Sequence, residues 1–303
     1  MTVAPLPEQV ARFYTTQSPF SDPGEFAPLY RDLPTDPAAL ARIVRGLFVH
    51  RLESPLFDVE LAPERVRDDA ETRYVDEILR LVAERDDAAL SEPRPVRSRF
   101  VGICRDFALL HCSLLRHAGV PARIRSGFAD YFDDGRSHVD HVVTEYWDAE
   151  RGWLLADPQV SELYDLPFDP ADVPRERFLV AGKAWQRIRA GLADPKEFGL
   201  PFFQPPLVGS WFVAGNVRLD LAALNRVETL LWDEWGLGAG SDEGMTDEIS
   251  ELYDLAAAVS ADEVPFDRAR ELFAENAGLR TPAVVNCLAL EQGFSEVTLR
   301  SWV

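Results

Sequence analysis

The sequence contains few cysteines and no Cys-x-x-Cys pair. Only three of its 303 residues are cysteine: Cys104, Cys112 and Cys287. A sparse and odd number argues against a disulfide framework and fits a reducing compartment. Without paired cysteines, a zinc site built from thiolates is also disfavoured.

Long apolar runs are missing as well. No stretch approaches the ~20 apolar residues that a membrane-spanning helix needs. The segment Met1–Gln9 is rich in proline and has no basic residue followed by an apolar run, as an export signal would. We therefore expect a cytoplasmic protein with no membrane partner.

Positive charge is the third deficit. Lysine and arginine total 31 against 51 acidic residues, which gives a formal net charge of -20. A strongly acidic surface repels phosphate backbones and anionic lipids, so nucleic acid is excluded as an expected partner. A neutral or basic small substrate fits better.

The N-terminal part of the chain predicts short helices in a loosely structured arm. We expect one helix near Glu8–Tyr14. Asp36 and Pro37 are a cap and a first-turn residue for a second helix that runs through Ala39–Val49. An apolar stripe predicts a third helix over Ala70–Arg85.

The centre of the chain predicts a buried helix followed by strands. Phe100–His117 is mostly apolar, and Gly119 is placed to end the helix. Strands are expected at Ala122–Phe128, Val142–Trp147 and Gly152–Ala156, with a turn at Asp133–Gly135. This order favours an α+β fold, in which an antiparallel sheet packs on one helix.

The last part of the chain reads as helical. Residues 161–210 are rich in proline and predict loops, and amphipathic helices are expected at Leu219–Trp235, Thr246–Val259 and Asp267–Ala277. We therefore predict three parts: an N-terminal helical arm at 1–64, a core at 65–165, and a helical C-terminal region at 166–303 that packs on the core or covers it. Two aromatic segments, Phe202–Pro205 and Gly209–Phe212, predict packing between domains or a lid.

Cys104 is the candidate nucleophile. It lies at the start of the predicted buried helix, where free N–H groups and the helix dipole favour thiolate over thiol. His141 precedes a predicted strand and is the candidate base. Asp157 follows the next strand and is the candidate that orients the imidazole. This nucleophile, base and orienter arrangement is that of the serine-protease triad, with sulfur in place of oxygen.

Several sequence blocks in this region resemble the transglutaminase-like superfamily. They are Gly102–Cys104, Val120–Arg123, His141 with Glu145, Gly152–Trp153, and Asp157–Pro158. The resemblance implies a papain-like core, with Cys104 on a helix that faces a small antiparallel sheet. It also implies a Cys104, His141 and Asp157 triad in a superfamily that includes transglutaminases, proteases, amidases and acyltransferases.

The expected activity is acyl transfer from a small peptide or amide, either to water or to an amine, with no organic cofactor. The backbone N–H of Cys104 would hold the oxyanion, and Ser98 or Arg99 are candidates for a second donor. Two alternatives stay open. One is a catalytically idle binding scaffold, and the other is a metal-dependent hydrolase built on His138, Asp140 and His141.

Overall fold

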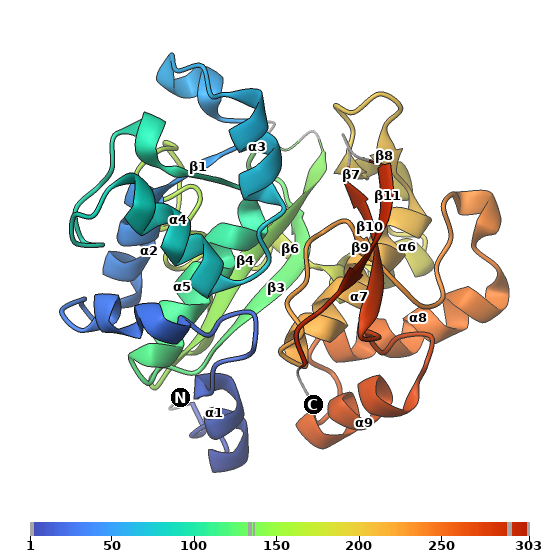
Figure 1. Ribbon diagram of the computed structural model, residues 1–303. Coiled ribbons are helices and arrows are strands. Elements are labelled where there is room, and N and C mark those ends of the chain that lie inside the picture. Colours follow the sequence, from blue (N-terminus) through green and yellow to red (C-terminus); the bar gives the residue numbers. More distant parts are fainter. Residues whose placement is uncertain (1–2, 133–134, 136, 290–292, 302–303) are drawn as a thin grey trace. The chain divides into compact units, whose positions relative to one another are not determined.

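The computed structural model describes residues 3–132, 135, 137–289 and 293–301 (Figure 1). The described residues form two compact units. The first comprises the chain up to Ile124 together with Val143–Val173, and the second comprises Arg125–Val142 together with Pro174–Ser301. The predicted domain limits at 64/65 and 165/166 stay predictions.

The chain passes between the two units within two long strands, β3 (Ala122–Ala129) and β4 (His138–Asp148), and once more between Val173 and Pro174. The strand order is β6-β3-β4-β7-β8, and β5 pairs with β4. The shorter strands are β5 (Gly152–Ala156), β6 (Phe178–Val180), β7 (Phe198–Leu200) and β8 (Leu207–Val208). Helices and mainly antiparallel strands occur together, so the predicted α+β class is confirmed.

Two N-terminal helices of the first unit match the sequence closely at their starts. Helix α1 spans Glu8–Thr15 and helix α2 spans Pro37–Leu47. The Asp36 carboxylate accepts the N–H of Ala39 at 2.8 Å, as expected of a helix cap. The expected end at Val49 is wrong, because Phe48–His50 forms strand β1, which pairs in parallel with strand β2 (Phe100–Gly102).

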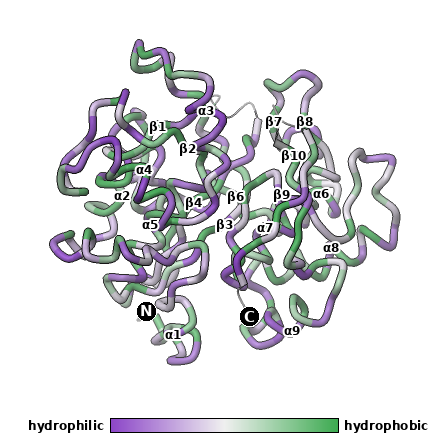
Figure 2. Tube along the Cα trace, viewed as in Figure 1, coloured by the Kyte–Doolittle hydropathy of each residue, from purple (hydrophilic) through white to green (hydrophobic). Residues whose placement is uncertain are grey.

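The helix expected over Ala70–Arg85 is in fact two helices, α3 (Pro63–Ala70) and α4 (Val75–Arg85). The chain is extended at Tyr74, with φ −118° and ψ 138°. The interruption has a tertiary cause, since the carbonyl of Arg73 accepts a 2.6 Å hydrogen bond from the buried Arg105. Most residues of helix α3 are hydrophilic, as Figure 2 shows, so the sequence has no apolar stripe from which to predict this helix.

Helix α5 (Cys104–His117) is the buried helix at the centre of the first unit. It begins at Cys104 and not at Phe100, because Phe100–Gly102 is taken up by the ladder with β1. Burial extends along almost its whole length. Gly119 follows the helix end with φ +79°, so the predicted glycine stop is confirmed.

Strands β3, β4 and β5 lie where the sequence predicts extended chain. Strand β4 begins at His138, earlier than expected, so His141 lies within the strand and not before it. Strands β4 and β5 are antiparallel, and Thr144 is opposite Ala156. Asp133 and Asp134 of the predicted turn lie outside the described residues.

The second unit departs most from the sequence prediction. The region expected to be loop-rich contains helix α6 (Ala181–Arg189), and the helix expected from Leu219 is α7, which spans Ser210–Leu224. Helix α7 is apolar and buried around most of its circumference, so it has no amphipathic period by which to find its start. Trp211 and Phe212, from one of the two aromatic segments, lie in its first turn.

The rest of the second unit combines helices with a small sheet. Helices α8 (Asp247–Ser260) and α9 (Phe266–Glu275) agree with prediction, and the Thr246 hydroxyl caps α8. The region also contains strands, because β9 (Asp233–Glu234), β10 (Val284–Ala289) and β11 (Gly293–Thr298) form a sheet in the order β11-β10-β9. Over the residues that the structure describes, no helix is long and apolar enough to cross a bilayer.

Candidate active site

Cys104 is the first residue of α5, directly after a strand. Strand β2 ends at Gly102, Ile103 is extended with φ −114° and ψ 170°, and the helix begins at Cys104. The side chain of Cys104 is 5% exposed. The predicted position at the N-terminus of a buried helix is therefore confirmed. The helix dipole and the N–H groups of the first turn lower the free energy of a thiolate there.

Asp106 holds this helix start in place. One of its carboxylate oxygens accepts the N–H of Ile103 at 2.9 Å, and the other accepts Nη1 of Arg105 at 2.9 Å. Asp106 is fully buried, and burial raises its pKa to about 6 despite the neighbouring guanidinium. Asp106 therefore both forms an ion pair with Arg105 and fixes the backbone at Ile103, where helix α5 begins.

Gly102, the last residue of β2, has little room for a side chain. A Cβ added to Gly102 would lie 3.1 Å from a carboxylate oxygen of Asp106 and 3.3 Å from the ring of Phe100. Glycine at this position therefore allows Asp106 to approach the backbone from which α5 starts.

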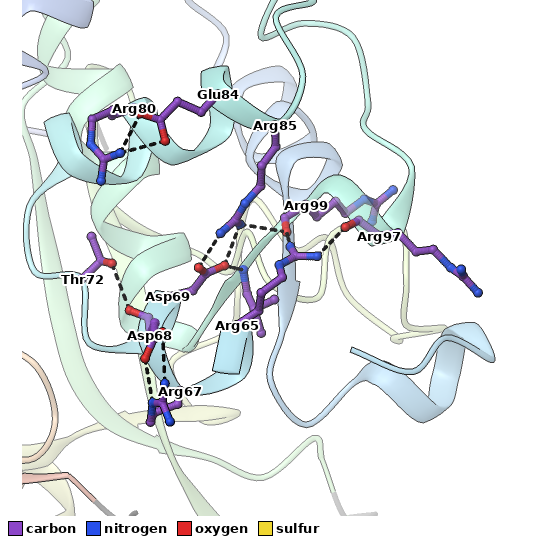
Figure 3. A network of polar contacts seen from close by, with 11 residues as sticks. Arg65, Arg67, Asp68, Asp69, Thr72, Arg80, Glu84, Arg85, Arg97 and Arg99 are labelled. Carbon is purple, nitrogen blue, oxygen red and sulfur yellow. Dashed lines mark hydrogen bonds and ion pairs between the residues drawn. The ribbon is translucent and has the colours of Figure 1, made fainter. Parts of the chain in front are cut away.

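Strand β2 is held from both sides. It pairs with β1 from Phe48↔Phe100 to His50↔Gly102. Asp69 accepts the N–H of Val101 at 2.9 Å and binds both terminal nitrogens of Arg85, at 2.6 and 2.7 Å (Figure 3). Asp69 was not predicted from the sequence, because its role as acceptor for the N–H of Val101 becomes evident only when β2 is known to be a strand.

Asp157 follows the last residue of β5 and is fully buried. Its N–H donates to the carbonyl of Pro170 at 2.7 Å, and its carboxylate accepts the N–H of Gln159 at 3.0 Å. These bonds fix the backbone on both sides of the carboxylate.

Within the first unit, Asp157 lies close to α5. Ala156 is opposite Thr144, and the Thr144 hydroxyl donates to the carbonyl of Ala108 at 3.1 Å, one turn after Cys104. The negative charge of Asp157 also acts on His111 of the same helix, although burial dominates and lowers the pKa of His111 to about 4.

His141 is buried on β4 among aromatic rings. The nearest is Phe132, with ring centroids 4.9 Å apart in an edge-to-face arrangement, followed by Tyr131 at 6.1 Å and Phe178 at 6.3 Å. Its neighbour Asp140 has a pKa raised to about 7 by burial, against the effects of His141 and Asn216. His141 belongs to the second unit, whereas Cys104 and Asp157 belong to the first, so a triad of the three is a proposal.

Other residues singled out from the sequence have structural contacts. Arg123 pairs with Glu145 at 2.7 Å, and its guanidinium lies 4.3 Å from the ring centroid of Trp153, so Arg123 contacts two other residues of the sequence blocks. Arg99, one of the two proposed oxyanion donors, directs Nε to the carbonyl of Arg94 at 2.9 Å.

Cys112 and Cys287 are buried in the core. His138 stacks on Phe198 with ring centroids 4.5 Å apart. In the described part of the chain, no group of three or more His, Cys, Asp and Glu side chains has the arrangement to hold a metal ion.

The described arrangement thus consists of a strand, a buried helix that begins with Cys104, and an antiparallel strand pair followed by the buried Asp157. Residues 67–158 match the model of the transglutaminase-like superfamily. This segment is transglutaminase-like, as the sequence blocks implied, and it contains Cys104, His141 and Asp157. Such proteins typically have a Cys-His-Asp enzyme core.

Solved structures give weaker similarities. A candidate cysteine protease from Cytophaga hutchinsonii is 15% identical, over 58% of this chain and 46% of its own, with a TM-score of 0.36. Red sea bream transglutaminase is 25% identical, over 42% of this chain and 22% of its own, with a TM-score of 0.28. The chain thus spans less than half the length of either structure. The comparison with curated proteins gave no match.

Proposed function

We propose that this protein is a cysteine-dependent acyl-transfer enzyme that acts on a small peptide or amide through Cys104, His141 and Asp157. The observation that carries the proposal is Cys104 as the first residue of a buried helix, within a segment that matches a superfamily of cysteine enzymes. The location supports an activated thiolate, since the helix start stabilises negative charge.

In the proposed reaction, His141 takes the thiol proton and the sulfur of Cys104 attacks the amide carbonyl. The backbone N–H of Cys104 donates to the resulting oxyanion. His141 then gives its proton to the leaving amine, the C–N bond breaks, and a thioester remains on Cys104. Asp157 accepts a hydrogen bond from the imidazole and keeps it oriented throughout.

The thioester passes to water or to an amine. His141 removes a proton from that acceptor and returns it to the sulfur of Cys104 when the thioester breaks. We favour water, because hydrolysis requires no second pocket for an acceptor. An amide of small size, such as a short peptide, is the proposed substrate class.

Alkylation with iodoacetamide across pH 4 to 9 tests the nucleophile. Peptide mass spectrometry locates the label, and the buried Cys112 and Cys287 serve as internal controls. We expect fast labelling at Cys104 alone, with an apparent pKa well below the ~8.5 of an ordinary thiol. The pKa should rise in the His141→Ala variant, because an imidazolium no longer stabilises the thiolate.

A second readout is turnover of a library of short peptides and amides, with and without an added amine. We expect Cys104→Ala to abolish turnover and Asp157→Asn to lower it strongly, as for misoriented triads. Labelling of Cys104 at the rate and pKa of a free thiol would overturn the proposal and favour the idle scaffold.

A further inference from the structure

The first unit contains a cavity of about 530 Å³ that the proposed reaction does not use. A volume of this size is within the ~300–1,000 Å³ range of small-molecule sites. Its apolar lining includes Pro34, Ile43, Phe57, Pro93 and Leu163, and its charged lining is Arg42, Arg45, Arg99 and Glu162. An apolar wall with a few converging charges is the usual construction of a ligand site.

Arg45, on α2, is a buried cation in the wall of this cavity. Its side chain is almost fully buried, and Nη1 donates to Glu53 at 2.8 Å. Nη2 is also buried, and among the described residues it has no hydrogen-bond partner. A buried guanidinium nitrogen without an acceptor leaves part of the positive charge of Arg45 uncompensated, which favours an anion in the adjoining cavity.

Arg99 adds a second cation next to the first. Its Nη1 lies 3.4 Å from the carbonyl of Arg45, and burial together with the charge of Arg45 lowers its pKa. The ring of Phe57 lies against both guanidinium groups, at 5.5 Å from Arg45 and 5.8 Å from Arg99. The positive charge of Arg45 acts on Arg99, and an anion bound in the cavity would offset this repulsion between like charges.

The carboxylates at the cavity do not balance the cations. Glu53 is fully engaged, since it also accepts the N–H of His50 and bonds from Gln159 and Tyr164. Glu162 lies 3.7 Å from Arg42, and the side chains of Arg42 and Glu162 are 47% and 68% exposed, so this pair is weak. The lining has three guanidinium groups and one carboxylate, and one net positive charge remains when Glu53, the partner of Arg45, is also counted, in a chain whose net charge is -20.

We propose that this cavity binds a small monocarboxylate with an apolar body. The carboxylate is held by Arg99 together with Arg45 or Arg42, because guanidinium groups match carboxylate geometry. The apolar body lies against Phe57, Ile43 and Pro93. One surplus positive charge suits a monoanion, and the apolar walls disfavour inorganic phosphate, which carries more charge and no apolar part.

Isothermal titration calorimetry of the full chain with hexanoate tests the proposal. Hexanol and hexylamine keep the apolar body without the negative charge, and inorganic phosphate keeps an anion without the body. We expect a heat of binding for hexanoate alone. Arg99→Gln should weaken hexanoate binding by about tenfold or more, the effect of losing one charged hydrogen bond. Arg80→Gln is the matched control, because Arg80 pairs with Glu84 on α4 and does not line the cavity.

Three results would overturn the proposal: no hexanoate binding at concentrations up to tens of millimolar, equal binding of hexanol, or stronger binding of phosphate. Unchanged affinity in a folded Arg99→Gln protein would do the same. If Arg99→Gln fails to fold by circular dichroism, Arg42→Gln replaces it, since Arg42 is half exposed and outside the buried pair. Binding in the Cys104→Ala variant separates this site from the proposed catalysis.

Discussion

Substitution of Gly102 by alanine should destabilise the protein, whereas substitution of Gly215 by alanine should stabilise it. The new methyl group would lie 3.1–3.3 Å from Asp106 and Phe100, tighter than ordinary van der Waals contact. Both neighbours are fully buried, so neither can move away cheaply. Overpacking of this kind typically costs about 1–3 kcal/mol.

Gly215 supplies the matched control. It lies inside α7, and a Cβ added there meets no atom within 4 Å. Gly215→Ala should therefore raise the free energy of unfolding by about 0.5–1 kcal/mol, because alanine loses less backbone entropy in a helix. Urea denaturation at pH 7.5 and 25 °C measures both changes.

The same variants report on the nucleophile. A displaced Asp106 weakens its bond to the N–H of Ile103, and with it the order of the helix start before Cys104. We expect alkylation of Cys104 at neutral pH to slow by about two- to fivefold in Gly102→Ala, which corresponds to the ~0.3–1 kcal/mol of a helix-end charge interaction. Alkylation in Gly215→Ala should be unchanged. Equal stability and equal labelling in all three proteins would refute this account of the junction.

Two other perturbations probe buried charges. Two nitrogens of Arg125 donate to the fully buried Asp220 at 3.0 and 3.1 Å. The Arg125→Met variant leaves this carboxylate without its cation, so the free energy of unfolding should fall by about 3–5 kcal/mol. The exposed Arg189→Gln should change it by less than about 1 kcal/mol, and similar losses in the two variants would contradict the reasoning. His111 has a folded pKa of about 4 against 6.5 unfolded, so below pH 6.5 the unfolded chain binds the extra proton and stability falls by about 3 kcal/mol by pH 4. His111→Gln keeps a donor for the Pro37 carbonyl and should flatten this part of the stability profile relative to the unmodified protein; superimposable profiles would exclude His111 as the cause.

The sequence was most informative where hydrophobic periodicity agrees with residues that typically begin or end a helix. Asp36 and Pro37 placed the start of α2, Gly119 placed the end of α5, and the apolar run between Cys104 and His117 predicted a buried helix. These signals are local, so they can be read without knowing what packs against them.

Errors occurred where long-range contacts override local pattern. Val101 pairs with Val49 from far along the chain, which takes Phe100–Gly102 out of the predicted helix. Tyr74 is extended because the carbonyls of Thr72 and Arg73 accept hydrogen bonds from Arg105. Helix α7 was misplaced because it is buried almost all round, which removes the period that marks a surface helix.

The candidate site divides in the same way. The position of Cys104 at a helix start and of Asp157 at a strand end follow from local signals and from sequence blocks. The supports of the site, Asp69 and the second bond of Asp106, required the strand β2 to be known. The ion pair between Arg45 and Glu53 likewise joins helix α2 to the turn after β1, and no local sequence pattern predicts it.

The β1–β2 pair has a consequence for how the protein acquires its nucleophile. Its partners, such as Phe48 and Phe100, are 52 positions apart along the chain, so the ladder requires the closure of a long loop before it gains any stability. Helix α5 can form early from its own sequence, but the strand that sets the position of Cys104 cannot. We therefore expect a chain that lacks the first 64 residues to keep a helical α5 and still present Cys104 as an ordinary, slowly reacting thiol.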